Sequence, residues 1–225
     1  MNSPETITFG RRGRPPRLLH QFESFEQQRE AASLGVWVFL VTEVMFFGAL
    51  FAAYVVYRWL HPAAFMMASR KLDIVLGALN TGVLLTSSLT MALAVRFAQI
   101  DRGRIAAILL LLTIALGAVF LGIKAHEYHE KFVEHLVPGP LFSAEFADPR
   151  GAQLFFCLYF GMTGLHAVHM IVGMGLLIGL LVPAFLGWFS PQDHGFIEGV
   201  GLYWHFVDIV WIFLFPLLYL VGRHV

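Results

Sequence analysis

The stretch from Leu34 to Trp59 reads LGVWVFLVTEVMFFGALFAAYVVYRW, and it decides the fold of the chain. Apart from Arg58 near its end, its only charged residue is Glu43, which lies among apolar and aromatic residues. A helix of about 20 apolar residues crosses the ~30 Å hydrocarbon core of a membrane. The stretch is therefore predicted to be a membrane-spanning helix with an ionisable group near its middle.

The composition of the whole chain agrees with a membrane protein. Hydrophobic residues make up 58% of it and charged residues 13%, which lies outside the range of soluble domains. The apolar blocks are continuous, whereas membrane barrel strands alternate apolar and polar residues. We predict an all-α, polytopic bundle of five transmembrane helices. The predicted spans are Leu34–Trp59, Leu72–Phe97, Ile105–Lys124, Gln153–Leu186 and Phe196–Val221.

Small residues in the fourth predicted span indicate how the helices pack. Helix backbones approach closely in lipid where small residues lie between them. This span contains five glycines, namely Gly161, Gly164, Gly173, Gly175 and Gly179. We expect them to serve tight packing within the bundle.

Residues 1–30 form a separate polar and basic arm in this interpretation, and residues 31–225 form the bundle. The arm carries Arg11, Arg12, Arg14 and Arg17 around two prolines. The first span is too long for the apolar region of a signal peptide, and no small-residue cleavage site closes it. With the predicted spans, eight Lys and Arg residues lie on one side of the membrane and seven on the other. The compact cluster next to the first span predicts a cytoplasmic N-terminus and, with five spans, an external C-terminus.

Charge and cysteine content narrow the classes of partner. The formal net charge is zero, which argues against a nucleic acid, since a phosphate-binding protein needs a basic face. The predicted loop from His126 to Ala152 is acidic, which fits either simple solvation or attraction of a basic partner such as a cytochrome. Its acidic residues are Glu127, Glu130, Glu134, Glu145 and Asp148. The single Cys157 cannot form an internal disulfide and is expected to serve packing.

Glu43 admits two interpretations. An ionisable group at bilayer depth is costly, so it usually faces a partner, a cavity or a proton path, and a functional role is the default hypothesis. The alternative is a protonated Glu that hydrogen-bonds to a neighbouring helix.

The histidines within the spans raise the question of a haem or a metal. His166 and His169 are three residues apart on one helix face, so they cannot bind opposite sides of one haem. A single site that uses His205 with one of this pair stays open, as does a metal site that includes Asp208. The simpler interpretation is a hydrogen bond between His205 and Asp208, at positions i and i+3, that joins helices without a cofactor.

Several motifs together resemble subunit III of the haem–copper respiratory oxidases. The segment Tyr203-Trp204-His205-Phe206-Val207-Asp208-Ile209-Val210-Trp211 is similar to the last helix of that family. Thr42-Glu43-Val44-Met45-Phe46-Phe47 resembles its acid-bearing motif, and Leu79-Asn80-Thr81 matches its next helix. His126-Glu127-Tyr128, the segment from Thr163 to His169 and Glu198 also fit. The motifs occur in the family's order from about residue 34 to 221, in its five-helix bacterial form.

The resemblance implies a subunit that is not catalytic by itself. It implies no haem, copper or other metal in this chain, but haem and copper in partner subunits I and II, with structural phospholipids bound. Subunit I is the expected main contact, with subunit II, a fourth subunit and cytochrome c as further partners, in a bacterial inner membrane. The implied role is to support proton uptake and to protect the working enzyme from turnover inactivation.

The resemblance also gives roles to individual residues. Glu43 matches a buried, carbodiimide-reactive carboxylate near lipid. His166, His169, His205 and Asp208 become interhelical hydrogen-bonding or lipid-contacting residues. Glu127 and Glu198 are expected near span ends, where water or another subunit satisfies them, and Arg96, with Arg102 and Arg104, lies where a lipid phosphate could be held. The Glu43 motif favours the cytochrome c branch. A quinol oxidase, a nitric oxide reductase accessory protein and a b-type cytochrome are the alternatives.

Overall fold

The computed structural model describes residues 21–140, 142, 146–186 and 195–223. These residues are mainly helical and contain no strand. The helices are α1 (Phe25–Leu60), α2 (Pro62–Ser69), α3 (Ile74–Gln99), α4 (Gly103–Val133), α5 (Pro149–Phe185) and α6 (Gly195–Phe215). Within the described residues, five of them are long and apolar enough to cross a membrane, namely α1 and α3 to α6. The predicted all-α, five-span architecture is confirmed.

Side-chain caps explain where three of these helices begin. Ser24 accepts a hydrogen bond from the Gln27 amide at the start of α1, and Asp73 accepts from the amides of Val75 and Leu76 at the start of α3. Asp148 caps α5 through the Gly151 amide, ahead of Pro149 at the first helical position. Such caps satisfy backbone N–H groups that the first helical turn leaves unpaired.

Asp148 also ties the end of α1 to the start of α5. Its Oδ2 lies 2.7 Å from His61 Nδ1, between α1 and α2. The Gly151 amide and the His61 side chain lower the pKa of the Asp148 carboxyl, because both favour its charged form. The short helix α2, which the sequence analysis did not predict, packs against α5 through Phe65 and Phe155, whose ring centroids are 5.4 Å apart.

The helix ends differ most from the predicted span ends at two places. Helix α4 continues to Val133, so the predicted loop from His126 to Ala152 was too long at its start. The error arose because Glu127 and Lys131 look like loop residues but line the buried face of the helix. Helix α1 begins at Phe25, inside the predicted polar arm. The arginine cluster of the predicted arm lies within residues 1–20, which are outside the described residues. Glu145 is also outside them.

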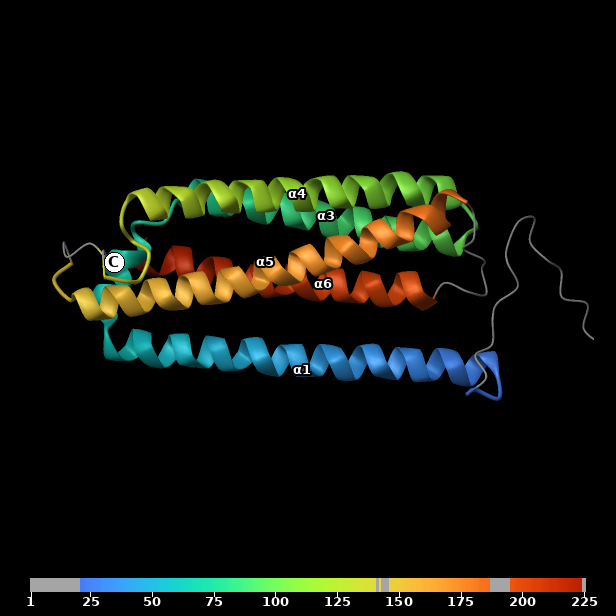
Figure 1. Cartoon of the computed structure of the whole chain (residues 1–225), viewed down its shortest axis with the longest axis horizontal. Coiled ribbons are helices and arrows are strands. Elements are labelled where there is room, and N and C mark those ends of the chain that lie inside the picture. Colours follow the sequence, from blue (N-terminus) through green and yellow to red (C-terminus); the bar gives the residue numbers. More distant parts are fainter. Residues whose placement is uncertain (1–20, 141, 143–145, 187–194, 224–225) are drawn as a thin grey trace, which may run out of the picture.

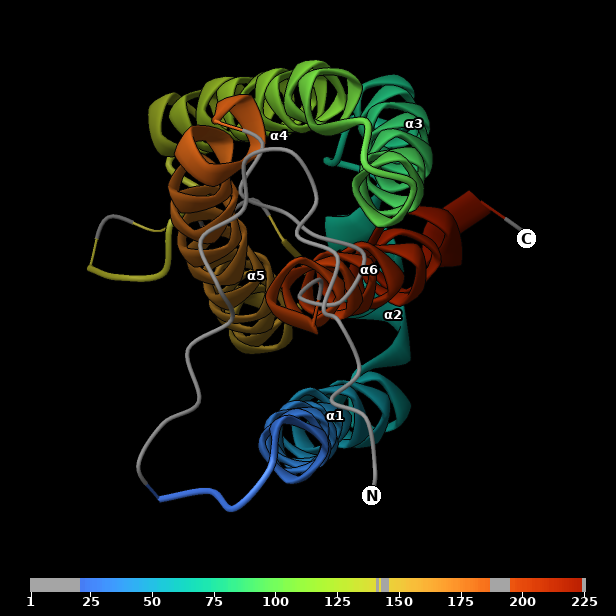
Figure 2. The same cartoon turned by 90° about the vertical axis from the view of Figure 1, so that its right-hand side faces the viewer.

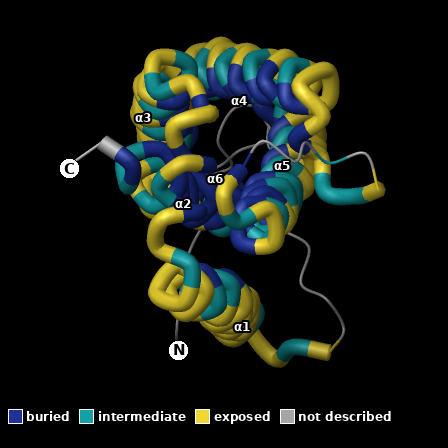
Figure 3. Tube along the Cα trace, turned by 90° about the vertical axis from the view of Figure 1, so that its left-hand side faces the viewer, coloured by how far each residue is buried: buried dark blue, intermediate teal, exposed yellow. Residues whose placement is uncertain are grey.

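Helices α3, α4, α5 and α6 pack around one another, and α1 lies to one side of them (Figures 1 and 2). Helix α1 begins and α6 ends at opposite ends of the bundle (Figure 1), as an odd number of spans requires. Figure 3 shows buried residues on the inner faces of α3 to α6, whereas α1 is largely exposed. The side of the membrane on which each end lies stays a prediction.

Helix α1 touches the rest of the bundle along one narrow line. Its buried side chains are Leu40, Phe47 and Tyr54, which recur every seven residues. This heptad spacing places all three on a single seam of the helix. Phe47 lies edge-on to Phe206 of α6, and the Tyr54 hydroxyl donates to the carbonyl of Leu217. That carbonyl belongs to a π-helical turn, Pro216–Leu220, at a proline that cannot donate a backbone hydrogen bond.

Glycine serves close packing at one of the five predicted positions in α5. A Cβ at Gly173 would lie 2.9 Å from the Trp204 ring, whereas Gly161, Gly175 and Gly179 have no atom within 4 Å of that position. At Gly164 the closest atom is the Tyr128 hydroxyl at 3.8 Å, an ordinary contact. Of these five glycines, Gly173 is therefore the tightly packed one, beside the buried Trp204.

Substitution of these glycines tests the packing. Gly173→Ala is expected to lower the Tm of the chain in mild detergent, because the new methyl group would force the Trp204 ring to move. Gly179→Ala, on the same helix at an open position, is the matched control and should keep or raise Tm. Equal Tm values for the two variants would contradict this packing.

Candidate functional site: a groove beside the first helix

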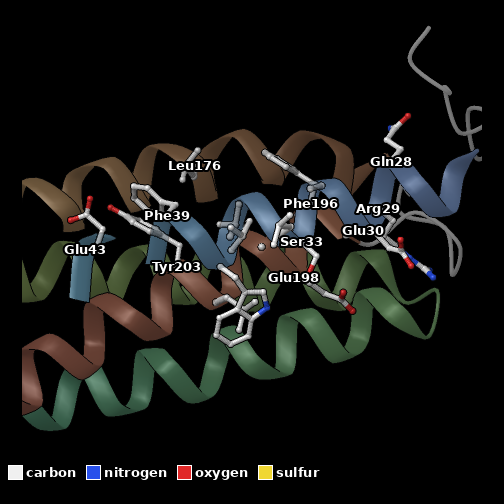
Figure 4. A pocket seen from close by; sticks show the side chains of 18 of the residues that line it. Gln28, Arg29, Glu30, Ser33, Phe39, Glu43, Leu176, Phe196, Glu198 and Tyr203 are labelled. Carbon is white, nitrogen blue, oxygen red and sulfur yellow. The ribbon is translucent and has the colours of Figure 1, made fainter. Parts of the chain in front are cut away.

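A groove with a volume of about 1520 Å³ lies between α1, α5 and α6 (Figure 4). It is larger than the ~300–1,000 Å³ of typical small-ligand pockets. It extends along α1 from Glu26 to Glu43, which corresponds to about 26 Å at a rise of 1.5 Å per residue. Its apolar lining comes mainly from Leu34, Val36, Trp37, Phe39, Val168, Val172, Leu176, Phe196 and Leu202.

The inner end of the groove holds Glu43 and His169. Glu43 Oε2 of α1 lies 3.1 Å from His169 Nε2 of α5, and both side chains are more than four-fifths buried. His169 Nδ1 lies 2.8 Å from the Leu165 carbonyl, which can only accept, so Nδ1 carries a proton. One proton then lies between Glu43 and Nε2, either on the carboxyl or on the imidazole. The pair is neutral overall in both forms, which reduces the cost of its location within the membrane.

Two aromatic residues contact His169. The Tyr203 hydroxyl of α6 donates to the His169 carbonyl at 3.0 Å, and the Phe47 ring lies edge-on to the imidazole at 5.3 Å between centroids. In Figure 4, Tyr203 and Phe39 lie beside Glu43 at this end of the groove. The predicted site residues Glu43 and His169 therefore contact each other. This contact matches the interpretation of Glu43 as a residue that hydrogen-bonds to a neighbouring helix.

The other end of the groove is polar. It is lined by Arg29, Glu26, Glu30 and Glu198. Figure 4 labels Arg29, Glu30 and Glu198 at this end of the groove. Glu198 is in the first turn of α6, so its predicted location near a span end is correct. Its Oε1 accepts a hydrogen bond from Gln99 Nε2 at 2.6 Å. Three carboxylates and one guanidinium at the mouth suit a headgroup that carries both charges.

A second polar cluster lies inside the α3–α6 unit, away from the groove. Glu127 Oε2 accepts from Lys124 Nζ at 2.9 Å, and its Oε1 accepts from the hydroxyls of Tyr159 and Tyr219. Lys124 Nζ also lies about 5 Å from the centroid of the Tyr159 ring and of the Trp211 ring, within cation–π range. Glu127 is fully buried, so the expectation that water or another subunit satisfies it was wrong: its partners are within this chain.

The predicted hydrogen bond between His205 and Asp208 is absent. His205 Nδ1 lies 2.7 Å from the Ser88 hydroxyl of α3 instead, and Asp208 is buried without a hydrogen-bond partner among the described residues. The two positions lie on one helix, but the side chains turn to different neighbours. His166 is also buried, with its ring 5.3 Å from that of Trp211.

The arginines predicted to hold a phosphate are not at the groove. Arg96 is exposed near the end of α3 and does not line it. Arg102 and Arg104 line a smaller hollow with the end of α5, at Ala184, Phe185 and Leu186.

The contacts of His169 disfavour this residue as a haem ligand. Both ring nitrogens of His169 already have partners, and Nδ1 of His205 is bonded to Ser88. Iron ligation by His169 would break either the contact with Glu43 or the one with Leu165. Among the described residues, no group of three His, Cys, Asp or Glu side chains is arranged to hold a metal ion.

These features define a class of protein: a five-span helical membrane protein with one helix set apart over a long apolar groove. A family model described as cytochrome c oxidase subunit III matches residues 23–223. The chain belongs to this family, the subunit III family of haem–copper oxidases, and is a multi-pass membrane protein.

Relatives with assigned names are subunits of two kinds of oxidase. The chain is 33% identical over 192 residues to cytochrome c oxidase subunit 3 of Thermostichus vulcanus, covering 84% of this chain and 87% of the relative. It is 31% identical to quinol oxidase subunit 3 of Bacillus spizizenii, over 84% of this chain and 86% of the relative. It is 28% identical to the probable quinol oxidase subunit 3 of Staphylococcus haemolyticus, over 89% and 94%.

Sequence reasoning missed several residues of these sites. Tyr203 and the polar groups at the groove mouth were not singled out as lining a common space, because the groove depends on how far α1 stands from α5 and α6. Lys124, Tyr159 and Tyr219 were also missed. The spacing of Lys124 and Glu127 at i and i+3 was a readable signal for a buried ion pair.

Removal of the Glu43–His169 contact tests its contribution to the fold. Glu43→Leu leaves His169 Nε2 without its partner and is expected to lower the free energy of unfolding by about 1–2 kcal/mol. Glu43→Gln can still donate to Nε2 and should cost less. Glu30→Leu, at the exposed groove mouth, is the control and should change it by no more than about 0.5 kcal/mol. Equal effects of Glu43→Leu and Glu30→Leu on reversible unfolding in mixed detergent would refute the contact.

A second variant pair tests the buried ion pair. Lys124→Met leaves the Glu127 carboxylate buried without its counter-charge, and a loss of about 3–5 kcal/mol is expected. The double variant Lys124→Met/Glu127→Gln should recover part of that loss, since it removes the stranded charge. Lys71→Met, at an exposed position, serves as control. A double variant no more stable than the single one would contradict an ion pair at this site.

Proposed function

We propose that the chain is the non-catalytic subunit III of a bacterial terminal oxidase that transfers electrons from cytochrome c to oxygen. The observation that carries the proposal is the match to the subunit III family over residues 23–223, nearly the whole described chain. In this proposal the protein lies in the inner membrane, with its N-terminus in the cytoplasm and its C-terminus outside. The positive cluster next to the first span supports that orientation.

Subunit I is the proposed main partner, with subunit II and a fourth subunit as further contacts. Haem and copper are proposed to reside in these partners and not in this chain. The occupied ring nitrogens of His169 support that assignment for this histidine, since neither of them is available to iron without the loss of a contact. The exposed apolar side chains of α1 also need a partner or lipid to cover them; they include Trp37, Val41, Val44 and Met45.

A structural phospholipid is the proposed occupant of the groove. Its apolar walls suit an acyl chain, while Arg29 at the mouth suits the phosphate and the surrounding carboxylates suit a cationic amine. The Glu43–His169 pair would then lie next to the acyl chain near the middle of α1. Because it holds one proton between two groups, the pair could support proton uptake by the complex and its stability during turnover.

The identity of the electron donor is the finer part of the proposal. Cytochrome c is supported by the Glu43 motif and by the relative from Thermostichus vulcanus, named a cytochrome c oxidase subunit. Quinol is the second candidate, since the relatives from Bacillus spizizenii and Staphylococcus haemolyticus are named as quinol oxidase subunits.

Purification of the native complex through a tag on this chain tests the proposal. We expect a haem–copper subunit I and a copper-bearing subunit II to copurify, with all haem in the reduced-minus-oxidised spectrum accounted for by subunit I. Oxygen consumption should be supported by reduced cytochrome c. Consumption with quinol alone would shift the donor to quinol, and copurification with a nitric oxide reductase would overturn the oxidase assignment.

Blocking the groove tests the lipid. Val172→Trp places a bulky ring on the groove wall and should reduce the phospholipid that stays bound to the purified chain, by native mass spectrometry. Val182→Trp is the matched control, because Val182 is equally exposed on α5 but does not line the groove. Equal lipid retention in both variants would contradict lipid binding in the groove.

A further inference from the structure

Three buried polar side chains in the α3–α6 unit have no hydrogen-bond partner among the described residues. They are Asn80 of α3, His166 of α5 and Asp208 of α6, which are 0%, 1% and 2% exposed. All six of their side-chain nitrogen and oxygen atoms are unpartnered. Buried polar groups in folded proteins nearly always have a partner, so three together need an explanation.

The three residues occupy helix positions in contact with Trp211 or close to it along the chain. The Trp211 ring lies 5.3 Å from the His166 ring, and its Nε1 donates to Thr81 Oγ1, next to Asn80 in the chain. Asp208 precedes Trp211 by one helical turn. The three residues come from different helices that meet at this tryptophan.

Asp208 points into the interior of the unit. Trp204, Asp208 and Trp211 lie at i, i+4 and i+7 on one face of α6. Trp204 Nε1 donates to Ser87 and Trp211 Nε1 to Thr81, both on α3. Asp208 therefore lies between the two tryptophans, opposite the stretch of α3 that separates Thr81 from Ser87.

Neighbouring polar groups do not satisfy Asp208. The Ser88 hydroxyl approaches the Asp208 carboxyl as a potential donor. This hydroxyl lies 2.7 Å from His205 Nδ1, however, and by distance and angle neither Asp208 oxygen has a hydrogen bond among the described residues. A metal ion is also a poor fit, since no group of three ligating His, Cys, Asp or Glu side chains occurs in the described residues. The unpaired groups comprise an amide, an imidazole and a carboxyl, which together offer both donors and acceptors.

We propose that Asn80, His166 and Asp208 hold a cluster of bound water molecules inside the α3–α6 unit. Water fits this set because it both donates and accepts, and a buried water molecule typically makes two to four hydrogen bonds to polar groups that would otherwise be unpaired. The cluster is separate from the lipid groove. Groove residues Val168, His169 and Val172 lie on one side of α5, whereas His166 lies among the buried residues of that helix.

The proposed water cluster borders the Lys124–Glu127 pair. Lys124 Nζ is 5.2 Å from the centroid of the Trp211 ring, and the His166 ring is 5.3 Å from the same ring. Water at this point extends the polar interior of the unit from the ion pair toward Asp208. The interior thus contains a hydrated polar layer, bounded by Trp204 and Trp211.

Radiolytic hydroxyl-radical labelling of the full-length chain tests this proposal, with water itself as the probe. Radicals formed from bound water modify adjacent side chains even when bulk solvent does not reach them. Trp211 is expected to be modified about tenfold faster than Phe155, after correction for intrinsic reactivity, although both are fully buried. Phe155 packs among Tyr54 and Phe65 and is the dry comparison. Equal protection of Trp211 and Phe155 would overturn the proposal.

Two substitutions at Asp208 give an independent readout. Asp208→Asn keeps a polar group for water, so it should retain the rapid labelling of Trp211. Asp208→Leu removes that group and should slow the labelling and lower Tm, because the remaining water molecules lose a partner. In a dry interior the same change would remove an unpaired carboxyl and raise Tm, and that result would contradict the water cluster.

Discussion

A polar group inside a membrane must find its partner within the protein, and this constraint determines how the chain is arranged. The buried Lys124–Glu127 pair illustrates it. Both charges are removed from water, and the arrangement is tolerable because Tyr159 and Tyr219 complete the hydrogen bonds of the carboxylate. These partners come from α5 and the turn after α6. The position of one ion pair on α4 therefore depends on two other segments of the chain.

The position of α1 depends on apolar contacts along one line of the helix. Its seam of Leu40, Phe47 and Tyr54 buries only one line of the helix, so α1 stays beside the bundle and does not enter it. The contact between Glu43 and His169 adds a polar link near the middle of that seam. On one side of this link the helices enclose the groove, with its polar mouth at Arg29 and Glu198. A helix held by so few contacts gives a membrane subunit both a lipid-sized groove and an apolar surface for a partner.

The sequence was sufficient to predict the five spans, because continuous apolar blocks of membrane length have few alternative structures. It was less informative about helix ends. Lys124, Glu127 and Lys131 are charged, and only the buried face that they share shows that α4 continues through them. Glu43 and His169 were both predicted as site residues, but they are 126 positions apart, so their pairing depends on how α1 meets α5. The His205–Asp208 prediction was wrong because Ser88 of α3, which sequence spacing cannot locate, bonds to His205.

A cryo-electron microscopy map of the assembled complex in a lipid nanodisc would test the central claim most directly. We expect this chain to be packed against a haem-bearing subunit, with α1 apart from α3 to α6 and elongated density in the groove that ends near Glu43 and His169. All haem density should lie in the partner. Haem density between His169 and His205, or α1 packed closely enough to close the groove, would contradict the account.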